Sequence, residues 1–110
     1  HPSAEQRELY QSLIDAGADI VFGSHPHVLQ GMEPRGGGLI VYSLGNFVFP
    51  GMDGMERATE TAVVSVRLYG GTIRYINFTP ARISGTRTEI DSSGTVAKRY
   101  SGLTKLLSGD

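Results

Sequence analysis

The chain has 110 residues, with ten Lys and Arg against eleven Asp and Glu and a formal net charge of −1. This length fits one small domain over residues 1–110, or a fragment of one, and because the chain begins at His1 rather than Met we interpret it as a piece of a longer protein. No block of like charges suits nucleic acid, no apolar run approaches the ~20 residues of a membrane-spanning helix, and the absence of cysteine excludes disulfides.

The chain opens with a helix pattern followed by a short strand pattern. Ser3 and Gln6 have the spacing of a capping box, and apolar residues recur at helical intervals over residues 4–16. Residues 20–22, Ile-Val-Phe, favour a strand that ends at the following Gly and Ser. We therefore expect a helix, a tight turn and a buried strand.

Glycines divide the middle of the chain. Residues 28–33 have no clear period and remain ambiguous, whereas the three glycines at 36–38 mark a break before an apolar strand at 39–44. Gly45 and Asn46 then end that strand. The sequence thus predicts a second strand close in length to a typical buried one.

From residue 59 the pattern changes to the alternation of a half-buried strand. Apolar side chains occupy every second position over residues 61–69. Gly70 and Gly71 suit a two-residue turn in which both central residues need positive φ, and residues 72–79 return as the partner strand. This segment predicts a β-hairpin.

The last part of the chain predicts an edge strand, a loop and a helix. Residues 81–83 continue the strand character, residues 86–94 are polar and loop-like, and apolar residues from 96 to 107 form one helical stripe. We expect an α/β fold in which the strands at 20–22, 39–44, 61–69 and 72–79 form mostly one sheet flanked by the helices.

Two histidines stand in the loop directly after the first strand. Pro26 favours extended angles at His25, so that the rings of His25 and His27 can face one cavity where open α/β sheets bind ligands. Neutral imidazole is the commonest zinc ligand and also suits iron, which makes both rings candidate metal ligands. Alternatively they only hydrogen-bond the backbone at the strand end, which is the more frequent role of a bare His-x-His.

Three other polar residues are candidates to line the same cavity. Asn46 follows a strand end and could face the histidines, or it could equally serve the turn through its own backbone. Gln30 and Glu33 could orient an imidazole through its second nitrogen, although polar loop residues are more often simply solvated. The sequence assigns no catalytic residue.

Longer strings around these residues resemble a known family. Residues 16–31, Ala-Gly-Ala-Asp-Ile-Val-Phe-Gly-Ser-His-Pro-His-Val-Leu-Gln-Gly, and residues 42–49, Tyr-Ser-Leu-Gly-Asn-Phe-Val-Phe, resemble the two signatures of the CapA family of bacterial capsule-synthesis (poly-γ-glutamate) proteins. The Pro-Ser-x-x-Gln opening and the Phe-Thr-Pro at 78–80 are also similar. The resemblance covers most of residues 1–83.

The family is similar to calcineurin-like metallophosphoesterases, which implies the C-terminal portion of an αββα sandwich with a mixed sheet and flanking helices. His25 and His27 match the two histidines of a Gly-His-x-His metal motif in spacing, although Ser24 separates them from Gly23. The resemblance implies divalent Mn, Fe or Zn in the full-length protein. Because the earlier Asp-x-His, Gly-Asp and Gly-Asn-His motifs have no counterpart, we expect weak or absent metal binding and no activity in this chain alone.

Two functions follow from the resemblance. In the first, the full-length protein is a metal-dependent phosphoesterase-like hydrolase that acts in capsule assembly at the cell envelope or the extracellular side. In the second, it is a non-catalytic module that binds the polymer or serves as an assembly scaffold, because a fold constrains activity only loosely. The implied partners are an anionic capsule polymer or a phosphoester substrate, and an exposed apolar face would favour a homo-oligomer.

Overall fold

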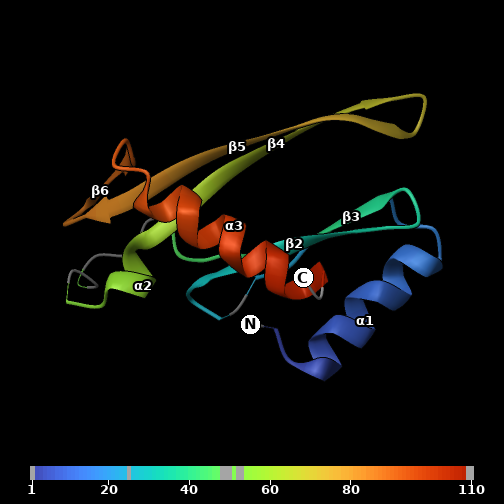
Figure 1. Ribbon diagram of the computed structural model, residues 1–110, viewed down its shortest axis with the longest axis horizontal. Coiled ribbons are helices and arrows are strands. Elements are labelled where there is room, and N and C mark those ends of the chain that lie inside the picture. The colour runs from blue at the N-terminus through green and yellow to red at the C-terminus, as the bar shows by residue number, and fades with distance from the viewer. Residues whose placement is uncertain (1, 25, 48–50, 52–53, 109–110) are drawn as a thin grey trace.

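The computed structural model describes residues 2–24, 26–47, 51 and 54–108. Its elements in chain order are α1 (Ala4–Asp15), β1 (Ile20–Phe22), β2 (Leu29–Arg35), β3 (Gly38–Leu44), α2 (Glu56–Thr59), β4 (Glu60–Tyr69), β5 (Thr72–Ser84), β6 (Arg87–Ile90) and α3 (Thr95–Ser108). The expected α/β class, with a mixed sheet, a β-hairpin and flanking helices, is confirmed (Figure 1).

The strands form two sheets, so the expectation of mostly one sheet is wrong. In the first sheet, ordered β1-β3-β2, β3 runs parallel to β1 and antiparallel to β2. In the second, ordered β4-β5-β6, all neighbours are antiparallel. The physical reason is that β2, the segment left ambiguous from its sequence, occupies the free edge of β3. With both edges of β3 paired, the long hairpin cannot join that strand.

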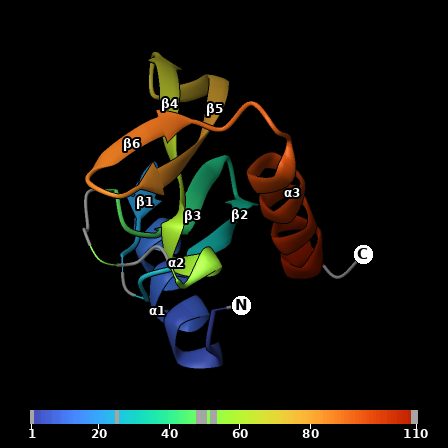
Figure 2. The same ribbon diagram turned by 90° about the vertical axis from the view of Figure 1, so that its left-hand side faces the viewer.

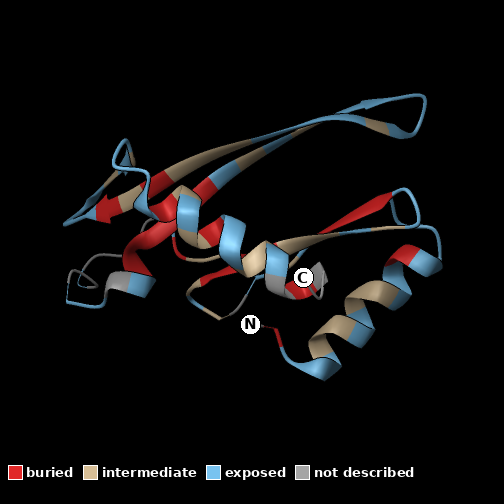
Figure 3. Ribbon diagram, viewed as in Figure 1, coloured by how far each residue is buried: buried red, intermediate tan, exposed pale blue. Residues whose placement is uncertain are grey.

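The two sheets and the helices form layers. In both Figure 1 and Figure 2, α1 lies below the first sheet and the β4–β5 hairpin lies above it. The C-terminal helix α3 runs along one side, where it contacts both β2 and β5. Burial follows this arrangement, because the half of the hairpin near α3 is mostly buried or half-buried and the half near its turn is mostly exposed (Figure 3).

Two apolar clusters form the core, and α3 contributes to both. The first cluster, between α1, β3 and the end of α3, consists of Ile14, Ile40, Tyr42 and Leu107. The second, between β2, β4 and α3, consists of Leu29, Ala62, Val96 and Tyr100. Aromatic stacking reinforces each cluster, with ring centroids 5.6 Å apart for Tyr10 and Tyr42 and 4.1 Å apart for Phe78 and Tyr100.

Most predicted elements are confirmed, with two differences in the second half. The Ser3 side chain accepts a hydrogen bond from Gln6 N at 3.1 Å, as the capping pattern predicts, and Gly70 and Gly71 adopt φ of 57° and 79°. The strand character at residues 81–83 belongs to β5 itself rather than to a separate edge strand. Residues 86–94 were expected to form only a loop, but they contain β6. This strand is short and mostly polar, and it forms by pairing with the end of β5.

Within the part of the chain that the structure describes, no helix is both long enough and apolar enough to cross a membrane.

Candidate functional site

The strand order forces the histidine loop across the end of β3. Since β1 and β3 are parallel, their carboxyl ends lie at the same edge of the sheet. The chain leaves β1 on one side of β3 and enters β2 on the other side, so the described residues of the connection, 23–24 and 26–28, lie at the carboxyl end of β3. Asn46 follows β3 at that end. Ligand sites of open α/β sheets commonly form at such places.

The β2–β3 hairpin aligns His27 with Asn46. The last registered pair of this hairpin is Leu29 and Leu44, and His27 and Asn46 stand two residues beyond it on their respective strands. Their side chains meet, with Nδ1 of His27 2.6 Å from Oδ1 of Asn46. Asn46 therefore lies beside the histidine loop and contacts it at His27.

The contacts of Asn46 determine which tautomer the neutral His27 ring adopts. The Asn46 side chain is 7% exposed, and its amide Nδ2 donates to the carbonyl oxygens of Ala58 at 3.1 Å and His27 at 3.4 Å. These two acceptors fix the amide orientation, so Oδ1 faces the ring and can only accept a hydrogen bond. The proton of neutral His27 is then on Nδ1, and its lone pair is on Nε2.

The loop is also held at its ends by Ser43. The Ser43 hydroxyl lies within hydrogen-bond distance of two carbonyl oxygens, that of Pro26 at 3.0 Å and that of Val28 at 2.8 Å, and it donates to the nearer one, Val28. The same hydroxyl accepts a hydrogen bond from the Gly45 N–H at 3.2 Å. Ser43 is fully buried in β3. These bonds set the path of the backbone on both sides of His27.

His25 lies outside the described residues, so its metal role stays a prediction. Among the described residues, no group of three or more His, Cys, Asp or Glu side chains is arranged to hold a metal ion. Near the loop, a hollow of about 410 Å³ lies between α1 and the two residues that flank His25. Its lining comprises Ser3, Glu5, Gln6, Leu9, Tyr10, Ser24 and Pro26.

The structure does not bring Gln30 and Glu33 to the His27–Asn46 pair, because both side chains contact α1. Gln30 is buried, and its Oε1 accepts a hydrogen bond from Gln6 Nε2 at 3.2 Å. The Glu33 carboxylate accepts bonds from Arg7 at 3.1 Å, from Gln11 at 2.8 Å and from the Tyr42 hydroxyl at 2.9 Å. Burial, together with the bond to Glu33, raises the pKa of Tyr42 to about 12.

Sequence reasoning missed one cluster near this edge. Glu60, at the start of β4, is completely buried, and three arginines surround its carboxylate: Arg57, Arg82 and Arg99. The signal was present in the sequence, since the alternation of β4 places Glu60 on the same face as the buried Ala62. A charged residue at such a position needs partners of opposite charge.

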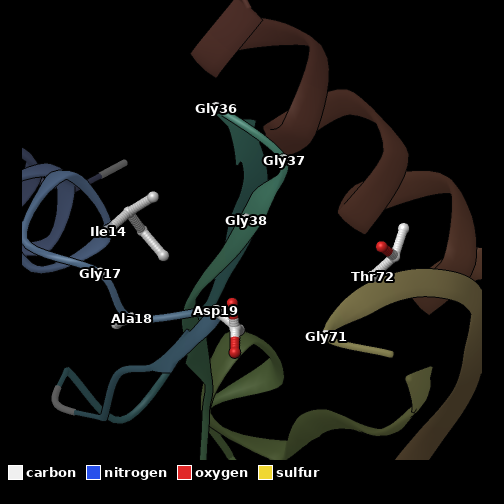
Figure 4. Close-up of a pocket in the computed structure, with 9 residues that line it drawn as sticks. All are labelled: Ile14, Gly17, Ala18, Asp19, Gly36, Gly37, Gly38, Gly71 and Thr72. Carbon is white, nitrogen blue, oxygen red and sulfur yellow. The ribbon is translucent and has the colours of Figure 1, made fainter. Parts of the chain in front are cut away.

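A separate pocket lies at the far end of the β2–β3 hairpin. It has a volume of about 290 Å³ and is enclosed by the loop after α1, the β2–β3 turn and the β4–β5 turn (Figure 4). Glycines dominate its lining, to which Asp19 contributes a charged side chain. None of the candidate site residues lines this pocket, so we do not include it in the site.

Comparison with known proteins supports the resemblance of the two signatures to the CapA family. The profile of the family described as "Bacterial capsule synthesis protein PGA_cap" matches residues 1–51. The capsule biosynthesis protein CapA of Bacillus anthracis is 38% identical over 105 residues, which are 94% of this chain and 25% of that protein. The PGA biosynthesis protein CapA of Bacillus subtilis (strain 168) is 47% identical over 75 residues, which are 67% of this chain and 19% of that protein.

Together these observations define an α/β fold in which the described parts of two sequence signatures meet, at His27 and Asn46, at the carboxyl edge of a mixed sheet. The chain belongs to the CapA family of bacterial capsule-synthesis proteins. It spans about a quarter or less of the length of the relatives it matches.

Proposed function

We propose that the protein acts in poly-γ-glutamate capsule synthesis and that His25, His27 and Asn46 contribute to a divalent metal site. The names of the two Bacillus relatives support the capsule role. Since a capsule is built at the cell surface, we place this activity at the cell envelope. The reaction we assign to the whole protein is metal-dependent hydrolysis or transfer at a phosphoester-like bond, on a metallophosphoesterase-like αββα fold.

The observation that carries the proposal is the contact between Nδ1 of His27 and Oδ1 of Asn46. Histidines that bind metals usually donate their second ring N–H to a protein oxygen, which fixes the tautomer and directs the other nitrogen to the ion. Asn46 supplies such an oxygen, and its own orientation is fixed by two backbone carbonyls. This arrangement suits a ring that binds Mn, Fe or Zn through Nε2.

The metal would supply a Lewis acid and a hydroxide nucleophile. In this chain, His27 and His25 would hold the ion, and Asn46 would keep the His27 ring in position. A catalytic zinc site generally uses three protein ligands and a two-metal site uses more. We therefore expect tight metal binding and activity in the full-length protein, and neither in the 110-residue chain alone.

A second candidate function is a non-catalytic module that binds an anionic polymer. The partly exposed side chains of Arg57, Arg82 and Arg99 favour it, because guanidinium groups can bind carboxylates without any metal. In that case the full-length protein would bind the capsule polymer and would hold no stoichiometric metal.

The test is metal analysis of the purified full-length protein by inductively coupled plasma mass spectrometry. We expect one or two Mn, Fe or Zn ions per chain, and a loss of at least half of this metal in the double variant His25→Ala/His27→Ala. His1→Ala is the matched control, because it removes a histidine outside the motif. Metal content that is equal in all three proteins would refute the metal assignment, and a metal-free wild type that binds the polymer would select the second function.

A further inference from the structure

The β4–β5 hairpin carries arginines but no acidic residue over most of its length. Residues 61–88 contain four arginines, at positions 67, 74, 82 and 87, and no Asp or Glu. The acids that border this segment are Glu60 and Glu89. Both lie at the same end of the second sheet, because Arg82 of β5 is registered opposite each of them. The half of the hairpin near its turn therefore has arginines without an acidic neighbour in its own strands.

Arg67 and Arg74 are the two arginines of this half, and both are exposed. Arg67 lies seven residues after Glu60 in β4, about 20 Å away at roughly 3.3 Å per residue. In the part of the chain that the structure describes, no acidic side chain pairs with either arginine. Their guanidinium groups are thus accessible to a ligand.

The strand register assigns Arg67 to the outer face of the hairpin. Phe78 faces the core, where its ring stacks on Tyr100 of α3. Val64 is registered opposite Phe78 and shares its face, so Arg67, three positions further along β4, points to the other face. Tyr75 is registered directly opposite Arg67 and lies beside it on this outer face.

A groove of about 530 Å³ follows the outer face. Arg67, Tyr75 and Ser65 are among the residues that line it. Tyr75 is 57% exposed, so a large part of its ring surface is available for contact. This part of the hairpin is exposed in Figure 3 as well. The groove thus offers a guanidinium group, an aromatic ring and a hydroxyl group.

A second pair of an arginine and a tyrosine continues this surface toward the turn. The guanidinium carbon of Arg74 lies 5.9 Å from the centroid of the Tyr69 ring, which is a cation–π geometry. The register shifts between Arg67 and Leu68, so that Arg74 has no registered partner in β4. Such a bulge redirects a side chain. Alternation along β4 places Tyr69 on the same face as Arg67.

The chemistry of this surface suits a chain that carries carboxylates. A guanidinium group donates several N–H bonds in one plane to a carboxylate, and an exposed tyrosine ring packs against methylene groups. A γ-glutamyl unit has both a carboxylate and methylene groups. Asp19, which would repel such a chain, approaches the hairpin at Gly71 and Thr72 of the turn (Figure 4) and does not line the groove.

The groove is distant from the candidate site but lies on a strand that contacts it. The Thr61 hydroxyl of β4 donates a hydrogen bond to the carbonyl oxygen of Leu44, two residues before Asn46, at 2.7 Å. Arg67 is six residues beyond Thr61, which is about 20 Å at roughly 3.3 Å per residue. A ligand in the groove would therefore be a remote part of a long substrate rather than its reacting bond.

We propose that the outer face of the β4–β5 hairpin is a docking surface for poly-γ-glutamate. Arg67 and Arg74 bind its carboxylates, and the rings of Tyr69 and Tyr75 contact its methylene groups. The choice of this polymer rests on the proposed function, whereas the docking of a polyanion rests on the hairpin alone. Remote contacts of this kind hold and orient a substrate without taking part in the reaction.

The experiment measures binding of a fluorescein-labelled poly-γ-glutamate oligomer to the full-length protein by fluorescence anisotropy. EDTA is present throughout, so the outcome does not depend on any metal. Variants are first compared by circular dichroism and thermal unfolding. Arg67→Gln is the primary variant, because it breaks no hydrogen bond or ion pair among the described residues. Arg87→Gln is the matched control, since Arg87 is an exposed arginine of the same sheet outside the groove.

Arg67→Gln and Arg74→Gln should each weaken binding about 3- to 5-fold, as expected for the loss of one exposed ion pair, and the double variant about 10-fold. Tyr75→Ser should weaken it about 3-fold through the loss of ring contact. Arg87→Gln should change affinity less than twofold. Raising the ionic strength about tenfold should weaken binding of the wild type more than that of the double variant, because salt screens exposed charges.

These losses, with a smaller salt dependence in the double variant and an unchanged control, would establish the docking surface. The proposal is overturned if the oligomer does not bind, or if Arg87→Gln weakens binding as much as Arg67→Gln. A second arm replaces the oligomer with vesicles of phosphatidylglycerol and phosphatidylcholine. Vesicles that bind more tightly than the oligomer, and lose this binding in Arg67→Gln, would assign the surface to a membrane and also overturn the proposal. Metal content of the full-length protein decides the proposed metal site separately.

Discussion

Gly31 of β2 lies directly against the backbone of Thr104 in α3. A Cβ atom placed at Gly31 would stand 2.7 Å from the Thr104 nitrogen, closer than two such atoms approach in real structures. The next residue of the strand, Met32, donates a hydrogen bond from its N–H to the Thr104 hydroxyl at 3.2 Å. The absence of a side chain at Gly31 therefore allows α3 to pack onto the first sheet.

The first prediction is that Gly31→Ala lowers the free energy of unfolding by about 1–3 kcal/mol, because the added methyl group pushes α3 away from β2. Urea unfolding followed by circular dichroism measures this change. Gly102→Ala is the control, since Gly102 is a helical position with open space around it, and it should stabilise the protein by up to about 1 kcal/mol. A neutral Gly31→Ala would show that α3 does not pack as described.

The second prediction concerns Asn46. Asn46→Ala removes the acceptor for the His27 ring and leaves the Ala58 carbonyl without its donor, so we expect a loss of about 1–3 kcal/mol in stability. In the full-length protein it should also lower metal affinity by about 10- to 100-fold, as for other residues that orient a ligand. Asn77→Ala, at an exposed position of β5, should do neither, and metal titration compares the two variants.

The third prediction concerns stability at alkaline pH. The pKa of Tyr42 is raised to about 12 in the folded protein, above the value of about 10 of an unfolded chain. Its contribution to stability is therefore fully present below pH ~10 and is lost as the pH rises through about 12. Tyr42→Phe should reduce this alkaline loss, and a pH series of urea unfolding midpoints for the two proteins measures it. Parallel pH profiles would contradict the prediction.

The fourth prediction concerns stability at acid pH. Asp91 accepts hydrogen bonds from the Ser93 side chain and from Val96 N in the first turn of α3, and these bonds lower its pKa. A lowered pKa gives stability above the unfolded value of about 3.9 that is lost as the pH falls through the folded value. Asp91→Asn keeps an acceptor oxygen but loses the negative charge near the helix N-terminus, so it should cost about 0.5 kcal/mol at pH 7 and less near pH 3.

Asp15→Asn is the matched control for this measurement. Asp15 pairs with Arg35 at 2.9 Å, and the bond lowers its pKa, but both side chains are exposed. Because exposed ion pairs contribute little to stability, Asp15→Asn should have a smaller effect at every pH. A larger effect for Asp15→Asn than for Asp91→Asn would contradict the capping role of Asp91.

The elements with a clear period could be predicted from the sequence, whereas β2 could not. Its sequence, Leu-Gln-Gly-Met-Glu-Pro-Arg, contains Gly31 and Pro34, both of which disfavour a strand interior. Gly31 is needed for contact with α3, and Pro34 is an exposed position near the turn. Tertiary packing therefore decided this strand, and missing it also concealed the division into two sheets.

The proximity of Asn46 to the histidine loop could be predicted from the sequence, whereas the contact between the two side chains could not. His27 and Asn46 were identified from a loop and a strand end, and their contact follows only from the register of a hairpin that was not recognised. Gln30 and Glu33 were considered as residues that could orient an imidazole, whereas their side chains contact α1. Strand alternation alone could not show this, because the position of α1 over the sheet is a tertiary feature.

The two glycines at the opposite end of the β2–β3 hairpin set the strand register on which the candidate site depends. Gly36 and Gly37 have φ of 54° and 84°, as a two-residue primed turn requires, and Arg35 is thereby paired with Gly38. This register fixes which residues face each other along the rest of the hairpin, up to His27 and Asn46. Inserting one residue in the turn would offset the strands by one position, about 3.4 Å, and would present the His27 ring to a neighbour of Asn46 instead. The geometry of the candidate site therefore depends on a turn that does not contact it.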